Sequence, residues 1–292
     1  MDEDKTARCI ADVKAVLGEG PVWVEREQSL YWVDIKGRRI FRYALEGGEL
    51  TEWPAPFRIC SLAPRAEGGF IAGTEDGFAF VDPAANRFGL QFDPEPERAT
   101  NRFNDGKLDR AGRFWAGTMD DAEVEASGAL YRLSPGAAPV RVDDGYKVTN
   151  GPAFSPDGRL MYHNDSALQT TYVFDLDEAG EASGRRVFLS FGEGDGYPDG
   201  MTVDAEGCLW IAFWDGWCLR RYAPSGELLQ HYELPVQKPT SCAFGGPGLD
   251  HLFVTSASIG LDEKALAGQP EAGGLFLLMP GVKGLADGLF AG

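Results

Sequence analysis

The chain has 292 residues, 43% hydrophobic and 25% charged, so it can bury a large core and is not disordered. Its 27 basic and 45 acidic residues give a net charge of −18 without any stripe rich in Lys or Arg, which makes nucleic acid and anionic membranes poor partners. No apolar run is long enough to span a membrane, and the acidic start Met1-Asp-Glu-Asp-Lys is unlike a signal peptide.

The five cysteines are odd in number and include no closely spaced pair, which argues against a disulfide framework and against a zinc knuckle. Reduced thiols are typical of the cytoplasm, so we expect a cytoplasmic protein, present as a monomer or a weak dimer. The three histidines His163, His231 and His251 lie far apart, and no Gly-x-Ser-x-Gly elbow is present. Both observations disfavour a Ser-His-Asp triad.

A repeat runs along the whole chain. Each copy is a turn, in the clearest copies closed by Gly, followed by a short alternating strand that contains an aromatic residue. In chain order the copies begin at Glu25, Arg65, Asp109, Ser155, Asp204 and Gly246. A second short strand follows most copies, as in residues 39–43, 77–83, 128–133, 171–176 and 218–222.

Six such units, spaced by roughly 40–50 residues, match the blades of a propeller better than the strands of a β-sandwich. We therefore predict an all-β protein, a six-bladed β-propeller that forms a single domain over residues 1–292. Propellers usually close by pairing strands from both chain ends, so we expect Arg8 to Val16 to complete a blade with the C-terminal part. Only Glu263 to Ala267 has the pattern of a helical turn.

Polar residues precede four of the copies in one register. Each opens a short strand with a Gly close behind it, and the four are Glu19, Asn104, Asn150 and Asp199. In a propeller this is the innermost strand, whose leading end faces the central channel, so the four side chains should converge. A single Asn-Gly or Asp-Gly is usually a turn, but four in one register favour a shared site. Carboxylate and amide oxygens are ligands of hard divalent cations, which predicts a metal site on the central axis.

The other two copies carry no strong ligand at this position, where they read Cys60-Ser61 and Ser241-Cys242. One side of the ring is therefore expected to be open. Trp214, Trp217 and Tyr197 are expected near the channel mouth. The acidic stretch 119–128 is either a lid or a solvated loop.

Several short motifs follow one another in a fixed order. They are Leu17-Gly-Glu-Gly-Pro21, Arg102-Phe-Asn-Asp-Gly-Lys107, Ala116-Gly-Thr-Met119, Thr149-Asn-Gly151, Ser155-Pro-Asp-Gly158, Pro198-Asp-Gly-Met201 and Cys242-Ala-Phe-Gly-Gly246. In this order they resemble the family of senescence-marker protein (regucalcin), gluconolactonase and luciferin-regenerating enzyme, and the likeness covers nearly the whole chain. The resemblance implies a six-bladed propeller that binds a divalent cation and hydrolyses sugar lactones.

The resemblance also implies roles for single residues. Glu19, Asn150 and Asp199 would be the metal ligands, and Asp199 would also be the catalytic general base. Arg102 and Asn104 would contact the substrate, which moves Asn104 from the ring of ligands to a place beside the metal.

One departure from the family pattern concerns the substrate. Relatives often carry a Glu three residues after the Met of the Ala-Gly-Thr-Met motif, and here Ala122 stands at that position. Asp121 or Glu123 is expected to provide the missing substrate contact.

The expected function is therefore a divalent-metal-dependent lactonase that hydrolyses aldonolactones of the gluconolactone or xylonolactone type. Its cofactor would be one divalent ion, and oxygen ligands admit calcium, zinc, manganese, magnesium or iron(II). Two alternatives stay open: a calcium-binding regulatory protein of the regucalcin type without turnover, and a broader esterase or phosphotriesterase on the same scaffold.

Overall fold

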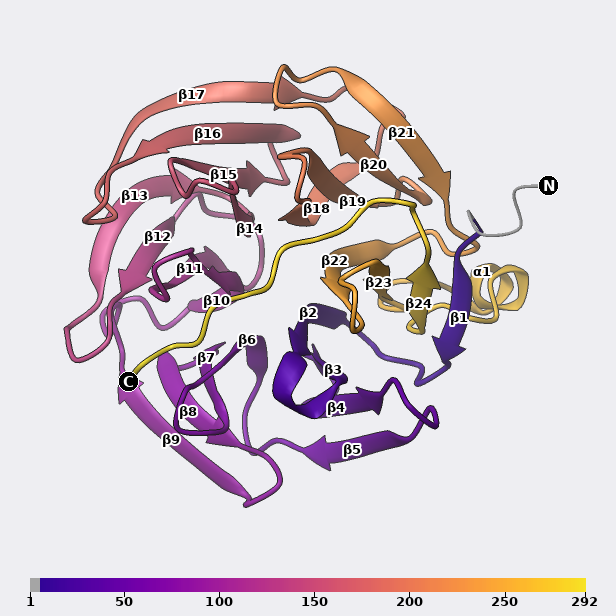
Figure 1. Ribbon diagram of the computed structural model, residues 1–292, viewed down its shortest axis with the longest axis horizontal. Coiled ribbons are helices and arrows are strands. Elements are labelled where there is room, and N and C mark those ends of the chain that lie inside the picture. The colour runs from indigo at the N-terminus through magenta and orange to yellow at the C-terminus, as the bar shows by residue number, and fades with distance from the viewer. Residues whose placement is uncertain (1–5) are drawn as a thin grey trace.

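The computed structural model describes residues 6–292. Its strands form six four-stranded antiparallel sheets arranged as blades around a central axis, as Figure 1 shows. The prediction of an all-β, six-bladed propeller is confirmed. None of the helices in the described part of the chain is long and apolar enough to cross a membrane.

Five blades are built from four consecutive strands each, ordered from the axis outward. The first comprises β2 (Gly18–Val24), β3 (Ser29–Asp34), β4 (Arg39–Ala44) and β5 (Leu50–Pro54). The second comprises β6 (Ile59–Pro64), β7 (Phe70–Thr74), β8 (Phe78–Asp82) and β9 (Arg87–Phe92). The third comprises β10 (Asn101–Leu108), β11 (Phe114–Asp120), β12 (Gly128–Leu133) and β13 (Val140–Tyr146). The fourth comprises β14 (Thr149–Phe154), β15 (Leu160–Asp165), β16 (Thr170–Leu176) and β17 (Ala182–Ser190). The fifth comprises β18 (Tyr197–Val203), β19 (Leu209–Trp214), β20 (Cys218–Tyr222) and β21 (Leu228–Glu233).

The sixth blade joins the two ends of the chain. It contains β22 (Pro239–Gly245), β23 (His251–Ser256), β24 (Leu275–Leu278) and, outermost, β1 (Arg8–Ala11). Arg8 pairs with Leu277 and Cys9 with Phe276, so the predicted closure is confirmed. The strand is shorter than the predicted stretch because the chain leaves the sheet after Ala11 to reach the inner strand of the first blade. The short helix α1 (Glu263–Gly268) lies between β23 and β24, at the position predicted for it.

Two aspartates explain why the repeated turn is followed by a tryptophan. In the third blade one oxygen of Asp109 accepts backbone N–H groups of the turn, and the other accepts the indole N–H of Trp115 at 2.8 Å. Asp204 and Trp210 make the same contact at 2.9 Å in the fifth blade. The turn residue Gly112 has a φ of 80°, a left-handed conformation that favours glycine. In these two blades the turn thus fixes a tryptophan side chain.

The pairing of the innermost strand with its neighbour is interrupted in all six blades. The register shifts fall at residues 19–22, 59–61, 103–106, 150–153, 198–201 and 239–241. Such a bulge bends a strand and redirects a side chain out of the regular alternation. In four of the blades the bulge coincides with, or lies next to, one of the polar residues that the sequence singles out.

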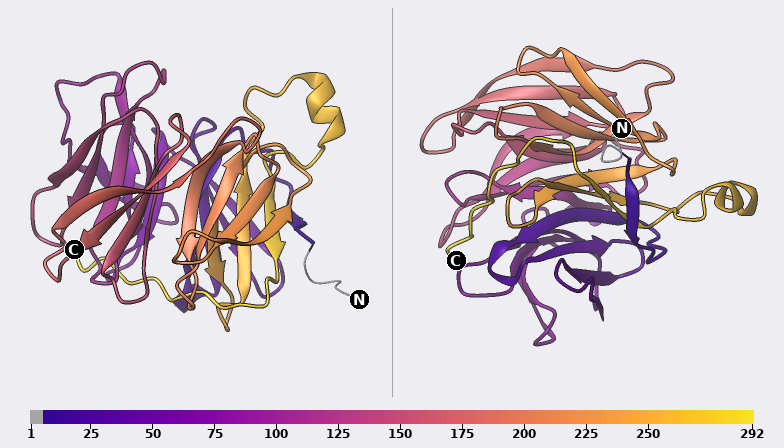
Figure 2. Two further views of the ribbon diagram at one scale, coloured as in Figure 1. Left: turned by 90° about the horizontal axis from the view of Figure 1, so that it is seen from above. Right: turned by 45° about the vertical axis from the view of Figure 1, so that its right-hand side comes forward.

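The two faces of the ring differ. The inner strands begin on the face that we call the upper face, and the turns between first and second strands lie on the lower face. The C-terminal segment (residues 279–292) crosses the lower face, as Figures 1 and 2 show. It is held by hydrogen bonds from Ala205 N–H to the Lys283 carbonyl (2.8 Å) and from Phe290 N–H to the Pro64 carbonyl (2.9 Å). The segment therefore ties the last blade to the second.

Candidate functional site

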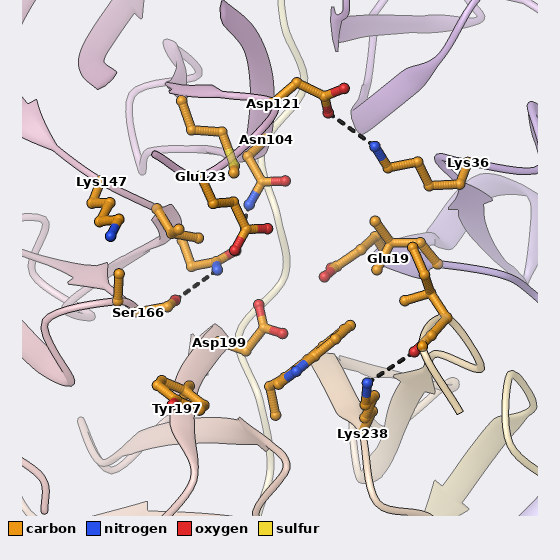
Figure 3. A pocket seen from close by; sticks show the side chains of 18 of the residues that line it. Glu19, Lys36, Asn104, Asp121, Glu123, Lys147, Ser166, Tyr197, Asp199 and Lys238 are labelled. Carbon is orange, nitrogen blue, oxygen red and sulfur yellow. Dashed lines mark hydrogen bonds and ion pairs between the residues drawn. The ribbon is translucent and has the colours of Figure 1, made fainter. Parts of the chain in front are cut away.

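A cavity of about 600 Å³ opens on the upper face at the axis. Five of the six blades contribute to its lining, and the second blade does not. All the residues predicted as metal ligands, general base or substrate contacts line this cavity: Glu19, Arg102, Asn104, Asp121, Asn150 and Asp199. Figure 3 labels four of them, Glu19, Asn104, Asp121 and Asp199. The structure thus brings together residues separated by up to 180 positions in the chain (199 − 19).

A chain of hydrogen bonds crosses the floor of the cavity. Arg102 Nη1 donates to Asn104 Oδ1 at 2.8 Å, and Asn104 Nδ2 donates to Asn150 Oδ1 at 3.0 Å. Asn150 Nδ2 donates in turn to Ser166 Oγ at 2.8 Å. These contacts fix the Asn150 amide with its nitrogen toward Ser166 and its oxygen toward Asn104. They also join the inner strands β10 and β14 of neighbouring blades.

Two carboxylates on other blades face the same space. Glu19 on β2 and Asp199 on β18 are 4% and 5% exposed. Burial, followed by repulsion from Asp105, raises the pKa of Glu19 well above its usual range. Burial and repulsion from Glu19 and Asp105 do the same to the pKa of Asp199. Within the described residues neither carboxylate has an ion pair with Lys, Arg or His, and the more distant Arg102 lowers the pKa of Glu19 by less than burial and Asp105 raise it.

This donor set fits a hard divalent cation. Two carboxylates and the amide oxygen of Asn150 are typical ligands of calcium, magnesium or manganese, and a cation would remove the repulsion between Glu19 and Asp199. Among residues 6–292 no three His, Cys, Asp or Glu side chains lie close enough to hold a metal. The amide oxygen of Asn150 is a neutral oxygen of the kind that such a cation also binds.

Asp121 also lines the cavity, but positive groups surround its carboxylate. Oδ1 accepts from Arg102 Nε at 2.6 Å and from Lys36 Nζ at 3.0 Å, and Oδ2 accepts from Arg58 Nη1 at 2.8 Å. Partial burial alone would raise the pKa of Asp121, but these three hydrogen bonds outweigh it and hold the pKa well below its usual range. Asp121 thereby fixes the guanidinium of Arg102, which is only 5% exposed.

Asp105, which the sequence analysis did not single out, does not line the cavity but directly follows Asn104 in the chain. It is 5% exposed and accepts hydrogen bonds from Gly106 N–H at 2.8 Å and Gly151 N–H at 3.0 Å. Burial raises its pKa to about 6. Simple strand alternation turns Asp105 away from the axis if Asn104 faces it, but the bulge in β10 breaks that alternation. A carboxylate directly after a predicted site residue, within an inner strand, was the available signal.

The mouth of the cavity is partly as expected. Tyr197 and Trp214 line it, whereas Trp217 does not. Trp217 lies in the turn after β19 and is 43% exposed, so its prediction as a mouth residue is not supported by the geometry. Glu123, in the turn between β11 and β12, lines the cavity with an exposed side chain.

The sequence model described as the SMP-30/gluconolactonase/LRE-like region matches residues 17–258. The chain belongs to this family. A 6-deoxy-6-sulfogluconolactonase from Pseudomonas putida is 37% identical over 99% of this chain and 100% of its own length. A regucalcin from Danio rerio is 38% identical over 97% and 98%. An L-arabinolactonase from Azospirillum brasilense is 37% identical over 98% and 96%.

Solved structures of similar proteins agree with this family assignment. A calcium-binding protein, regucalcin, from Agrobacterium tumefaciens has a TM-score of 0.93 and 30% identity, covering 98% of this chain and 97% of its own. A luciferin-regenerating enzyme has a TM-score of 0.91 and 31% identity, covering 98% and 99%. The predicted family is thereby confirmed. Because several relatives are lactonases by name, the expectation of a carboxylic-ester hydrolase agrees with the family.

Proposed function

We propose that this protein is a divalent-metal-dependent lactonase that hydrolyses aldonolactones of the gluconolactone or xylonolactone type to sugar acids. One observation carries the proposal: the carboxylates of Glu19 and Asp199 are buried, repel each other, and have no ion pair within residues 6–292, and they line the same cavity as the fixed amide oxygen of Asn150. The cavity has the size of a small-molecule site. Relatives named sulfogluconolactonase and L-arabinolactonase support lactones of sugar acids as the substrate class.

In this proposal Glu19, Asn150 and Asp199 hold the metal. A divalent cation bound there would lower the pKa of water and polarise the lactone carbonyl. Asp199 accepts a proton from the water molecule whose oxygen bonds to the carbonyl carbon. The bond between that carbon and the ring oxygen breaks, and Asp199 returns the proton to the ring oxygen. One water is consumed, and the product is an open-chain hydroxy acid.

Arg102 and Asn104 orient the substrate. Arg102 cannot act as a base, but its fixed guanidinium can donate hydrogen bonds to sugar hydroxyls or to the developing oxyanion. The ion pair with Asp121, 2.6 Å long, holds this group in place before substrate arrives. A side chain that is already positioned loses less conformational entropy on binding.

The test is acid release from glucono-, xylono- and galactono-lactones in weakly buffered solution. We expect acceleration that is lost on chelation and returns with one of the candidate divalent ions. If no lactone is hydrolysed in a chelator-sensitive way, the proposal is wrong. Elemental analysis of protein purified without added metal identifies the ion that the cell supplies.

A calcium-binding regulatory protein without turnover is the second candidate. It is favoured by the relatives named regucalcin, one of which is described as a calcium-binding protein. Calorimetric titration with calcium separates the two functions. Tight calcium binding without hydrolysis of any lactone would support the second candidate over the first.

A further inference from the structure

Three of the charged groups that line the cavity, those of Lys36, Arg102 and Asp121, are paired with one another. Asp121 is paired with Lys36 at 3.0 Å and with Arg102 at 2.6 Å. The carboxylates of Glu19 and Asp199 are the ones proposed to hold the divalent cation. The remaining charged lining residues are a carboxylate at the rim and two lysines, one of which, Lys238, lies 3.9 Å from a carboxylate oxygen of Asp215.

The two lysines, Lys147 and Lys238, differ in their surroundings and lie on different walls (Figure 3). Nζ of Lys238 donates to the Ile259 carbonyl at 2.8 Å and lies 4.5 Å from the ring centroid of Trp214. The ammonium group of Lys147 has neither a hydrogen bond nor an ion pair within residues 6–292. The rim carboxylate, Glu123, does not come within ion-pair distance of it. Lys147 therefore presents an uncompensated positive charge to the cavity.

The backbone that carries Lys147 is held in place. Asp165, fully buried at the end of β15, accepts hydrogen bonds from the N–H groups of Lys147 at 3.0 Å and Val148 at 3.3 Å. Asn150 follows three residues after Lys147, a span of at most about 10 Å. The carbon chain of a substrate whose carbonyl lies at Asn150 is therefore long enough to reach the Lys147 side chain.

We propose that Lys147 binds an anionic substituent of the substrate. The preferred substrates are then lactones of sugar acids that carry a sulfonate, phosphate or carboxylate at the end of the chain remote from the lactone carbonyl. An ammonium group forms strong charge-assisted hydrogen bonds with each of these anions. The protein as a whole carries a charge of −18 and repels anions, so an anionic substrate needs a local positive group. This inference rests on the proposed lactonase function.

The test compares kcat/KM for glucono-δ-lactone with that for its 6-phospho and 6-deoxy-6-sulfo derivatives and for a glucarolactone. The wild-type protein should prefer at least one anionic lactone, and the preferred one identifies the substituent. Lys147→Met keeps the length of the side chain and removes the charge. We define the selectivity ratio as kcat/KM for the preferred anionic lactone divided by kcat/KM for glucono-δ-lactone. Lys147→Met should lower this ratio by about tenfold or more, mainly by raising KM for the anionic lactone. Lys238→Met, on the other wall, should keep the wild-type ratio.

Two results would overturn the assignment. One is a ratio that Lys147→Met leaves unchanged. The other is that both Glu123→Gln and Lys147→Met reduce the hydrolysis of charged and neutral lactones equally. Lys147 would then act by pairing with Glu123 and not by binding an anion. If Lys147 binds the anion, Glu123→Gln should instead raise the ratio, since a nearby negative charge is removed.

Binding of the sugar acids separates this inference from the proposed function. If the wild-type protein hydrolyses no lactone, the lactonase proposal fails, but calorimetry with 6-phosphogluconate, its sulfo analogue, glucarate and gluconate still tests the subsite. One of the three anionic acids should bind more tightly than gluconate to the wild-type protein. For that acid, Lys147→Met should raise Kd about tenfold more than it raises Kd for gluconate. Equal losses for all four acids, or no preference over gluconate in wild type, would contradict it.

Discussion

Asp105 Oδ2 lies 3.0 Å from the backbone nitrogen of Gly151, so a carboxylate on the third blade holds the strand of the fourth blade directly after Asn150. The other oxygen, Oδ1, accepts from Gly106 N–H on its own strand. Asp105 thus fixes the relative position of two inner strands at the floor of the cavity. Its negative charge is also one cause of the raised pKa values of Glu19 and Asp199.

The first prediction concerns pH and metal removal. A carboxyl group whose pKa is higher in the folded than in the unfolded protein stabilises the fold fully below the unfolded value, and this contribution is lost as pH rises through the folded value. For Asp105 the pKa rises from 3.8 to about 6, which corresponds to roughly 3 kcal/mol. Between pH 5 and pH 8 the chelated protein should therefore lose roughly half of this amount of stability through Asp105, with Glu19 and Asp199 contributing in the same direction.

Thermal unfolding of the chelated protein, followed across this pH range with and without a divalent cation, checks the prediction. The cation should raise the unfolding temperature more at pH 8 than at pH 5, because protons compete with it at low pH. Asp105→Asn should flatten the pH dependence of the chelated protein. A flat profile in the unmodified protein would show that the three carboxyls do not interact as described.

The second prediction concerns Asp199 as ligand and base. Asp199→Asn keeps the size and one coordinating oxygen but removes the negative charge and nearly all basicity. At saturating metal, turnover should fall by roughly 10²–10⁴-fold, the range typical of a lost general base. Asn150→Asp is the contrasting variant, because it adds charge, should bind the cation at least as tightly, and leaves Asp199 in place. If fully metallated Asp199→Asn stays within a few-fold of wild type, Asp199 is not the base.

The third prediction concerns Arg102. Arg102→Ala should lower kcat/KM by about 10- to 100-fold, because a hydrogen bond from a charged group contributes about 1.5–3 kcal/mol. Metal content should stay unchanged, and elemental analysis of the purified variant measures it. Arg58→Ala is the matched control, since Arg58 pairs with Asp121 but does not line the cavity. An equal loss in both variants would mean that Arg102 acts only by placing Asp121.

The fourth prediction concerns the strand that carries Asp199. A Cβ atom added at Gly200 would lie 2.1 Å from Ser241 Oγ and 2.8 Å from Ser241 Cα, on the inner strand of the next blade. Gly200→Ala should therefore destabilise the fold by about 1–3 kcal/mol, the usual cost of overpacking. Gly89→Ala on the exposed strand β9, where the nearest atom is 3.5 Å away, should be close to neutral. Urea unfolding of both variants gives the comparison, and equal stabilities would contradict the close packing of the two strands.

The sequence predicts the blades and the converging residues well, because both depend on local patterns that repeat. The turn at Asp109 and the turn at Asp204 bind their tryptophans in the same way, so periodicity alone reveals the architecture. Glu19 and Asp199 share a register, and ring closure then brings them to one axis.

Contacts between different blades are harder to predict from the sequence. The pairing of Asp121 with Lys36 and Arg58 joins residues 85 and 63 positions apart, in turns whose lengths follow no repeat. The consecutive residues Asn104 and Asp105 both bond to the inner strand of the next blade, which the bulge allows and alternation does not predict. Lys147 lies between two strands and belongs to none of the motifs.

The C-terminal segment has a practical consequence for handling the protein. Since it crosses the lower face and ends near Arg65, whose Nε donates to the carbonyl of Gly292, the last residue points away from the cavity mouth. Material appended after Gly292 emerges on the side where no substrate enters. Immobilisation through a C-terminal tag should therefore orient every molecule with its cavity toward the solution. Attachment through lysines would not, because Lys36, Lys147 and Lys238 lie around the mouth itself.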